Sequence, residues 1–285
     1  MKNLSLPHGA SMPLLGFGVY QIPADETQAA VEAALQAGYR HIDTAAAYGN
    51  EEAVGAALRA VGLPRGDVFV TTKLWIQRAP AQANAERALT RSLERLGLES
   101  VDLFLMHQPM GDVYGQWRAM EALQAQGGAT EIGVSNFPVD RVVDLALHNE
   151  VAPAVNQIEV NPFHQRREKV AALQAEGVAV QAWAPFAEGR NGIFEHPVLV
   201  RIAAEHGASV AQVILAWVVS RDVVALAKSV RPERIAENLA AAELTLTPED
   251  LAAIEALDAG ESQFFDHADP KMVRWLGGRA EDPQG

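Results

Sequence analysis

The sequence contains no cysteine. Without thiols the chain can form no disulfide, offers no thiolate nucleophile and provides no cysteine ligand for a metal ion. Its eight histidines are scattered, with no His-x-His or His-x-x-x-His pair. We therefore expect no zinc site and no other metal centre, and any catalysis has to come from other side chains.

Positive charge is also scarce, because 23 Lys and Arg residues face 36 Asp and Glu residues and leave a formal net charge of −13. A net acidic surface repels nucleic acids and anionic membranes, so we expect neither as the main partner. An anionic small ligand would need its own local basic pocket.

Long hydrophobic runs are missing too. The N-terminal stretch lacks the apolar core of a signal peptide, and no uncharged stretch reaches the length needed to span a membrane. We expect a soluble, cytoplasmic protein. No linker rich in Pro, Gly or Ser divides the chain, so we expect one domain over residues 1–285, with residues 276–285 as a flexible tail.

What the sequence does contain is a series of short apolar runs that alternate with helical patterns. Continuous apolar runs are typical of parallel strands buried on both faces. Eight such runs between helices predict an α/β fold, a (β/α)₈ TIM barrel, with an N-terminal β-hairpin around His8-Gly9 as a cap. The alternative is an open doubly wound sheet, but "GFGVYQ" has Gln21 where a nucleotide-binding third glycine belongs. The expected strands lie within residues 14–18, 39–44, 67–73, 100–107, 129–136, 152–160, 177–185 and 223–229.

Polar or aromatic residues end these runs, and a barrel builds its active site where its strands end. They are Asp43 with Tyr48 in the following loop, Lys73, His107, Ser135-Asn136, Gln157, Trp183 and Lys228-Ser229.

Four of these side chains suggest proton donation by a phenol. Free tyrosine has a pKa of about 10, and a nearby ammonium such as that of Lys73 lowers it. Asp43 would hold and balance the lysine, and His107 would orient a substrate carbonyl by a hydrogen bond. These groups suit reduction of a C=O bond but supply no hydride, so a nicotinamide cofactor is implied.

Each of these residues also has a purely structural reading. Asp43 with Lys73 suits a buried ion pair, Tyr48 a loop anchor and His107 a core histidine. The catalytic reading gains from their shared position at one end of adjacent strands.

The residues also match a known pattern in "GYRHIDTAAAYGNE", "TTKLW", "DLFLMHQP", "GVSNF", "NQIEVNPF" and "KSVRPERIAEN". Over nearly its whole length the chain resembles the aldo-keto reductases, especially the bacterial branch that includes 2,5-diketo-D-gluconate reductases. The resemblance implies a (β/α)₈ barrel, NADPH/NADP+ and reduction of aldehydes or ketones. It also implies a catalytic tetrad of Asp43, Tyr48, Lys73 and His107, with Tyr48 as the acid.

The resemblance further implies the cofactor contacts. Ser135, Asn136 and Gln157 would hold the nicotinamide carboxamide, which both donates and accepts hydrogen bonds. Trp183 would stack on the nicotinamide ring, with core packing as its alternative. The remaining implied contacts are Gly18, Val19, Tyr20, Asp43, Ala184, Phe186, Lys228, Ser229, Val230, Arg231, Arg234, Glu237 and Asn238.

The segment "KSVRPERIAEN" favours NADPH over NADH. Pro232 suits the first position of a helix, whose N-terminus attracts phosphate. Lys228, Arg231 and Arg234 bring cations to the same place, where they would hold the 2′-phosphate. The alternative is a solvated helix face with Arg234 paired to Glu237 or Asn238.

Aromatic residues after the strands are candidates for the substrate pocket, with loop packing as the alternative. Beside Tyr20, Tyr48 and His107 we expect Trp75 and Trp117 as apolar walls, together with a C-terminal substrate loop, "FFDHADPKMVRWLG". The chain departs from the family pattern at Ala184, Ala227, Thr130 and Ala268, none of which belongs to the tetrad.

The sequence therefore predicts a monomeric NADPH-dependent reductase acting on a small carbonyl substrate. One alternative is an NADPH-binding sensor or regulatory subunit of the same superfamily with little turnover. Another is a phosphosugar isomerase on the same barrel, which leaves "KSVRPERIAEN" unexplained.

Overall fold

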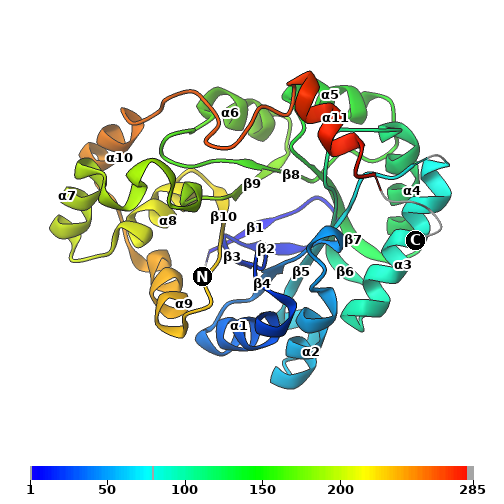
Figure 1. Cartoon of the computed structure of the whole chain (residues 1–285), viewed down its shortest axis with the longest axis horizontal. Helices are drawn as coiled ribbons and strands as arrows, with labels where there is room; N and C mark the ends of the chain where they lie inside the picture. Colours follow the sequence, from blue (N-terminus) through cyan, green and yellow to red (C-terminus); the bar gives the residue numbers. More distant parts are fainter. Residues whose placement is uncertain (1, 79, 281–285) are drawn as a thin grey trace.

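The computed structural model describes residues 2–78 and 80–280. Eight parallel strands close into a barrel in the order β10-β3-β4-β5-β6-β7-β8-β9 (Figure 1). The predicted (β/α)₈ barrel is confirmed, and the open sheet is excluded. The barrel strands are β3 (Leu15–Gly18), β4 (His41–Asp43), β5 (Phe69–Leu74), β6 (Val101–Met106), β7 (Ala129–Ser135), β8 (Val155–Glu159), β9 (Ala179–Trp183) and β10 (Val223–Ala227).

Helices surround the strands (Figure 1). In α3 the buried face includes Ala85, Ala88, Leu89, Ser92 and Leu96, which recur at helical spacing. The helices are α1 (Ala24–Ala37), α2 (Glu51–Val61), α3 (Ala81–Leu96), α4 (Val113–Ala125), α5 (Val139–Leu147), α6 (Arg167–Ala175), α7 (Pro197–His206), α8 (Val210–Ser220), α9 (Pro232–Leu239), α10 (Pro248–Glu255) and α11 (Pro270–Gly277), with short 3₁₀ turns at η1 (Ala46–Tyr48), η2 (Arg65–Asp67), η3 (Ala187–Glu195) and η4 (Ala240–Glu243).

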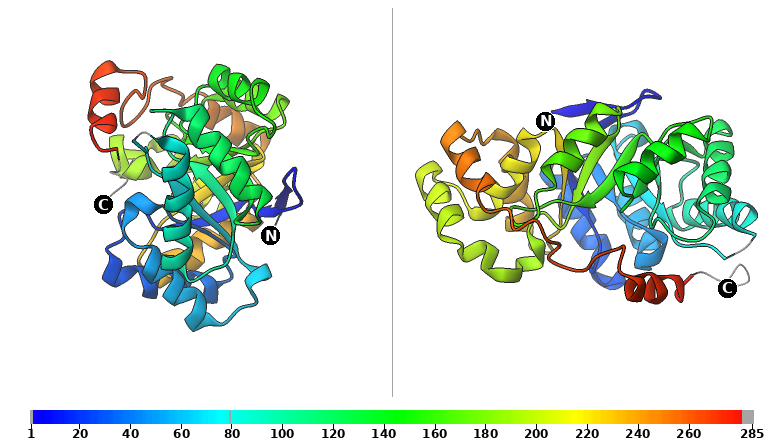
Figure 2. Two further views of the ribbon diagram at one scale, coloured as in Figure 1. Left: turned by 90° about the vertical axis from the view of Figure 1, so that its right-hand side faces the viewer. Right: turned by 90° about the horizontal axis from the view of Figure 1, so that it is seen from above.

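The predicted N-terminal hairpin is confirmed. Strands β1 (Asn3–Ser5) and β2 (Ser11–Pro13) pair antiparallel. Leu6, Met12 and Leu14 pack with barrel residues in one apolar cluster. The buried carboxylate of Glu131 in β7 fixes the hairpin tip, because its Oε1 accepts a 2.8 Å hydrogen bond from the His8 backbone N–H. The hairpin therefore closes the barrel end opposite the strand termini that carry the polar residues (Figure 2).

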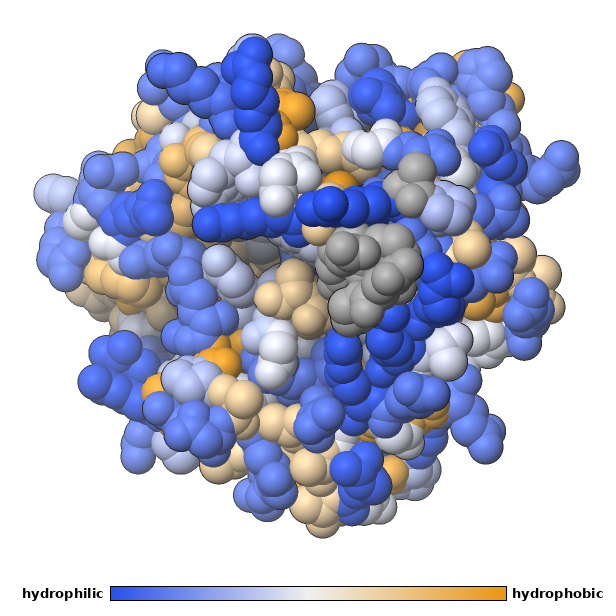
Figure 3. Space-filling view, turned by 45° about the vertical axis from the view of Figure 1, so that its right-hand side comes forward, coloured by the Kyte–Doolittle hydropathy of each residue, from blue (hydrophilic) through white to orange (hydrophobic). Residues whose placement is uncertain are grey.

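The apolar helix α8 is buried in the core through residues 213–218. Within the described parts of the chain, no single helix is long and apolar enough to cross a membrane. Taken together, the helices α7 and α8 are long and apolar enough for a membrane span, but the pair is bent by 91°. Figure 3 shows hydrophilic residues over most of the face that it presents, with hydrophobic residues scattered between them.

The C-terminal segment crosses the other end of the barrel, where α11 lies on the side opposite the hairpin (Figure 2). Leu276 is buried with Ile76 and Met110. The Trp75 indole N–H donates a 2.8 Å hydrogen bond to the carbonyl oxygen of Arg279. Leu276 and the Arg279 carbonyl are thus held against this end of the barrel, and the flexible tail over residues 276–285 stays a prediction. Residues 281–285 lie outside the described residues.

Candidate active site

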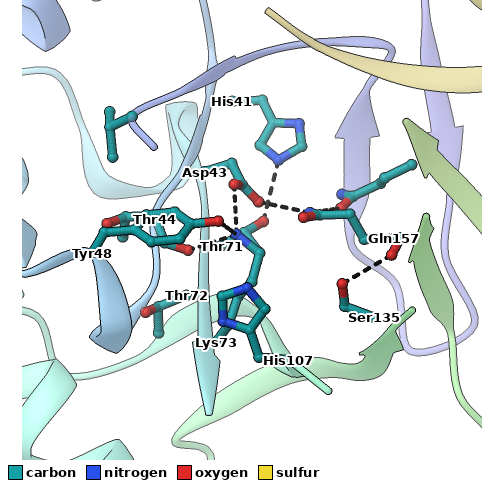
Figure 4. Close-up of polar contacts among 12 residues, drawn as sticks. His41, Asp43, Thr44, Tyr48, Thr71, Thr72, Lys73, His107, Ser135 and Gln157 are labelled. Carbon is teal, nitrogen blue, oxygen red and sulfur yellow. Dashed lines mark hydrogen bonds and ion pairs between the residues drawn. The ribbon is translucent and has the colours of Figure 1, made fainter. Parts of the chain in front are cut away.

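Three neighbouring strands and one loop bring the predicted tetrad together (Figure 4). The Lys73 ammonium on β5 lies 2.6 Å from Asp43 Oδ1 on β4. Its Nζ also donates to the Tyr48 hydroxyl at 3.2 Å and to the Thr44 carbonyl oxygen at 2.9 Å. His107 follows β6, and its ring lies edge-on to the Tyr48 ring at a centroid distance of 5.7 Å. The phenol, the ammonium and the imidazole therefore share one site.

The pKa of the Tyr48 phenol is raised well above its ordinary value, first by burial and then by repulsion from Asp43 and Tyr20. This differs from the expectation that Lys73 lowers it. Burial of the phenol is the main reason, and the Asp43 carboxylate, 2.6 Å from the Lys73 ammonium, offsets the effect of the lysine charge. Burial also lowers the pKa of Lys73, against the opposing effect of Asp43. Tyr48 therefore stays protonated in the cofactor-free protein, which is the form that a proton donor needs.

His107 is held as a neutral imidazole. Burial lowers its pKa well below the ordinary value, and Lys73 and His267 add repulsion against the charged form. Its Nδ1 is buried and has no hydrogen-bond partner among residues 2–78 and 80–280. A neutral ring still carries one N–H, so His107 can donate to a carbonyl oxygen at physiological pH.

A second histidine lies beneath the tetrad. His41 precedes Asp43 by two positions on β4 and is fully buried. Its Nδ1 lies 3.4 Å from the Pro13 carbonyl oxygen and its Nε2 lies 3.2 Å from Thr71 Oγ1. Gly16 leaves the space for this ring, because a Cβ there would lie 2.8 Å from His41 Nδ1.

His41 makes stability depend on pH. Burial lowers its pKa from 6.5 to about 4. Above pH 6.5 the folded and unfolded chains both keep the ring neutral, but below it only the unfolded chain readily takes up the proton, so the stability falls towards pH 4. Between roughly pH 8 and pH 5, His41 should cost the unmodified chain about 2 kcal/mol of unfolding free energy. His41→Gln should not show this part of the loss. Urea titrations of both proteins across this range test it, and parallel pH profiles would contradict it.

The tetrad opens into one large pocket of about 1360 Å³. This exceeds the roughly 300–1,000 Å³ of typical small-ligand pockets, so it has room for a dinucleotide and a substrate. Most of the predicted site residues line it: Gly18, Tyr20, Asp43, Tyr48, Trp75, His107, Ser135, Asn136, Gln157, Trp183, Ala184, Phe186, Lys228, Ser229, Arg234, Glu237 and Asn238.

Five predicted site residues do not line this pocket, and one of them is Lys73, which is fully buried behind it. Trp117 in α4 is fully buried in the core, and its indole N–H donates to the Val151 carbonyl oxygen at 3.0 Å, so it does not form a pocket wall. Val19 directly follows β3 and is buried. Val230 and Arg231 are exposed outside the pocket.

The sequence pattern missed Glu159 at this end of the barrel. Strand β8 ends at Glu159 rather than at Gln157. Glu159 is buried, and its carboxylate accepts hydrogen bonds from the Ser262 hydroxyl at 2.6 Å and the Gln263 backbone N–H at 2.9 Å. It thereby fastens the C-terminal segment, whose residues Phe264, Phe265, His267, Trp275, Leu276 and Arg279 line the pocket. An acidic residue at the end of a buried strand was the available signal.

Trp183 and Asn136 are fixed by each other. The Trp183 indole N–H donates to Asn136 Oδ1 at 2.9 Å. Asn136 Nδ2 donates to the His107 carbonyl oxygen and to Ser135 Oγ, both at 3.1 Å. The backbone of Asn136 has a φ of 64°, a left-handed conformation that asparagine tolerates better than most residues. The indole therefore does more than fill space in the core.

Comparisons with known proteins agree with this arrangement. Morphine 6-dehydrogenase from Pseudomonas putida is 41% identical over 271 residues, which cover 90% of this chain and 91% of that protein. Methylglyoxal reductase DkgA from Yersinia pestis is 40% identical over 261 residues, which cover 90% of this chain and 93% of that protein. An aldo-keto reductase from Bombyx mori, solved in complex with NADP, superposes with a TM-score of 0.88 at 34% identity, covering 94% of this chain and 96% of that one.

The predicted bacterial branch is confirmed by these DkgA-type relatives. The profile of the Aldo/keto reductase family matches residues 14–259, a span that contains all eight barrel strands and the complete tetrad. The chain therefore belongs to the aldo/keto reductase family.

Proposed function

We propose that this chain reduces aldehydes or ketones to alcohols with NADPH and that Tyr48 supplies the proton. The single observation that carries the proposal is the Tyr48 hydroxyl held 3.2 Å from the Lys73 ammonium at the floor of the large pocket. The relatives that share this family are curated carbonyl reductases and dehydrogenases.

When bound, the nicotinamide supplies the hydride to the carbonyl carbon. Tyr48 gives its proton to the carbonyl oxygen, and the phenolate that results lies beside the Lys73 ammonium, which stabilises it. The neutral His107 donates a hydrogen bond to the same oxygen and orients it. Asp43 holds the ammonium 2.6 Å away and keeps it aimed at the phenol.

The described residues fit a nicotinamide cofactor. Ser135, Asn136 and Gln157 place a hydroxyl and two amides at the pocket beside the tetrad. Trp183 offers a half-buried ring that packs on Phe264 at a centroid distance of 5.2 Å. Amides, a hydroxyl and an aromatic face suit the carboxamide and ring of nicotinamide.

The far end of the pocket suits the phosphate of NADPH. Lys228 and Arg234 line it, and Arg234 lies in the first turn of α9, which begins with Pro232. Among residues 2–78 and 80–280, Arg234 makes no ion pair, so the alternative of pairing with Glu237 has no support. An unpaired guanidinium at a helix N-terminus favours a 2′-phosphate, and we propose a preference for NADPH over NADH.

Arg234→Ala should weaken NADPH binding by about 10- to 100-fold and change NADH binding by less than about threefold, because only NADPH carries the 2′-phosphate. Quenching of tryptophan fluorescence gives both dissociation constants. Arg231→Ala is the matched comparison, since Arg231 lies on the same segment but outside the pocket. Equal losses for the two cofactors in the Arg234 variant would assign the arginine a structural role.

The relatives direct the first substrate panel, which would contain methylglyoxal, simple aldehydes and ketones. Steady NADPH consumption in an absorbance assay supports the enzyme, whereas tight NADPH binding without turnover would support the sensor alternative. One chain holds the whole tetrad, so we propose that a monomer is active, which light scattering during gel filtration tests. The cytoplasmic location stays a prediction.

A further inference from the structure

A column of buried polar side chains runs from the tetrad towards the N-terminal hairpin. Gln157 and Gln181 face each other as register partners on β8 and β9. Gln157 Nε2 donates to Asp43 Oδ2 at 2.8 Å and to Gln181 Oε1 at 2.7 Å. Gln181 Nε2 in turn donates to Met12 Sδ at 2.9 Å. Gln181 and Met12 are fully buried and lie outside the pocket lining.

The two ends of this column accept hydrogen bonds but donate none. The thioether of Met12 is a weak acceptor without a proton, and the ionised carboxylate of Asp43 only accepts. Gln181 therefore has to turn its NH₂ group towards Met12 and its oxygen towards Gln157. Gln157 then has to turn its NH₂ group towards Gln181 and Asp43.

Both hydrogens of the Gln157 amide are consumed in this way. Its Oε1 has no hydrogen-bond partner among residues 2–78 and 80–280, and the residue lines the pocket. The opposite amide orientation would place an oxygen against an oxygen at both contacts. The orientation of Gln157 is thus set before any ligand enters.

We propose that Gln181 and Met12 are positioning residues that fix the amide of Gln157, so that the pocket presents a preoriented acceptor to the cofactor. The inference rests on the cofactor site proposed above. Without Gln181 one buried N–H of Gln157 loses its acceptor, and the amide has to be reordered when the cofactor binds. The N-terminal hairpin, which forms the opposite end of the barrel, thereby contributes to cofactor affinity.

The first test uses NADPH affinity, measured by quenching of tryptophan fluorescence. Gln181→Leu should raise the dissociation constant about tenfold, and Met12→Leu, which conserves volume but removes the acceptor, about threefold. Gln165→Leu is the matched control. Gln165 is equally buried and hydrogen-bonded, but the partners of its side-chain amide are the backbone carbonyl oxygens of Pro162, Ile254 and Glu255, which lie outside the pocket. This control should lose stability while its dissociation constant stays within about twofold of the unmodified chain.

The second test follows the Gln157 amide in the cofactor-free protein by NMR with ¹⁵N-labelled glutamine. Its two NH₂ resonances, identified by their loss in Gln157→Leu, should be well separated and protected from solvent exchange. Gln181→Leu should remove the protection, and Gln165→Leu should not. A merely structural glutamine would leave these signals unchanged.

Unchanged affinity or unchanged Gln157 signals in Gln181→Leu would overturn the inference. If that variant fails to fold, Met12→Leu decides the same question, because it keeps the core volume. A failure of the unmodified chain to bind NADPH would overturn the proposed cofactor instead, and the NMR measurement would still decide how the amide is held.

Discussion

Tyr48→Phe should lower kcat for aldehyde reduction by about 10²- to 10⁴-fold, because the variant lacks the proton donor. The hydroxyl makes a single hydrogen bond among the described residues, with Lys73, so its removal leaves the pocket otherwise intact. We therefore expect NADPH to bind about as tightly as before. Steady-state kinetics at saturating NADPH, together with a fluorescence titration of NADPH, measure both quantities.

Tyr114→Phe is the matched control for this variant. Tyr114 lies on α4, where its hydroxyl donates to Asp144, and it does not line the pocket. Its turnover should equal that of the unmodified chain. If Tyr48→Phe kept its turnover, another group would be the acid, and the proposed mechanism would be wrong.

Lys73→Met should abolish turnover and also destabilise the fold. The side chains of Lys73 and Asp43 are 0% and 5% exposed, so the substitution leaves a buried carboxylate without its cation. Removing one partner of such a pair typically costs about 3–5 kcal/mol of unfolding free energy. Urea denaturation should therefore show a clear loss of stability, and kinetics should show a loss of turnover comparable to that of Tyr48→Phe.

The double variant Asp43→Asn/Lys73→Met separates the two effects. It removes both charges, so it should regain most of the unfolding free energy that Lys73→Met loses. Turnover should stay lost, because no ammonium faces Tyr48. Recovery of turnover together with stability would show that Lys73 acts only as half of a structural ion pair. This is the alternative that the sequence left open.

The acid form of Tyr48 follows from a balance that the sequence does not reveal. Spacing alone suggests that Lys73 lowers the phenol pKa, but the fold buries the hydroxyl and also places Asp43 near it, and both effects raise the pKa. In the cofactor-free protein the ion pair with Asp43 mainly keeps the Lys73 ammonium charged and directed at the Tyr48 hydroxyl. Its stabilisation of the phenolate matters only as the proton leaves.

The sequence by itself determined the barrel, its hairpin cap and the tetrad. Runs of apolar residues have to be buried on both faces, and strands that alternate with helices close into a ring with all their C-terminal ends together. Asp43, Lys73 and His107 sit at those ends, so a local pattern was enough to gather them.

Only the tertiary structure decided which other side chains reach the pocket. Trp75 and Trp117 both follow a strand, so the sequence predicts both as pocket walls. In the structure α4 places Trp117 in the core, whereas the Trp75 ring lies edge-on to the His107 ring at a centroid distance of 5.1 Å. Glu159 and Gln181 have hydrogen-bond partners that are far away in the chain, in the C-terminal segment and the N-terminal hairpin. Contacts between such distant segments depend on how the elements pack, which no local spacing encodes.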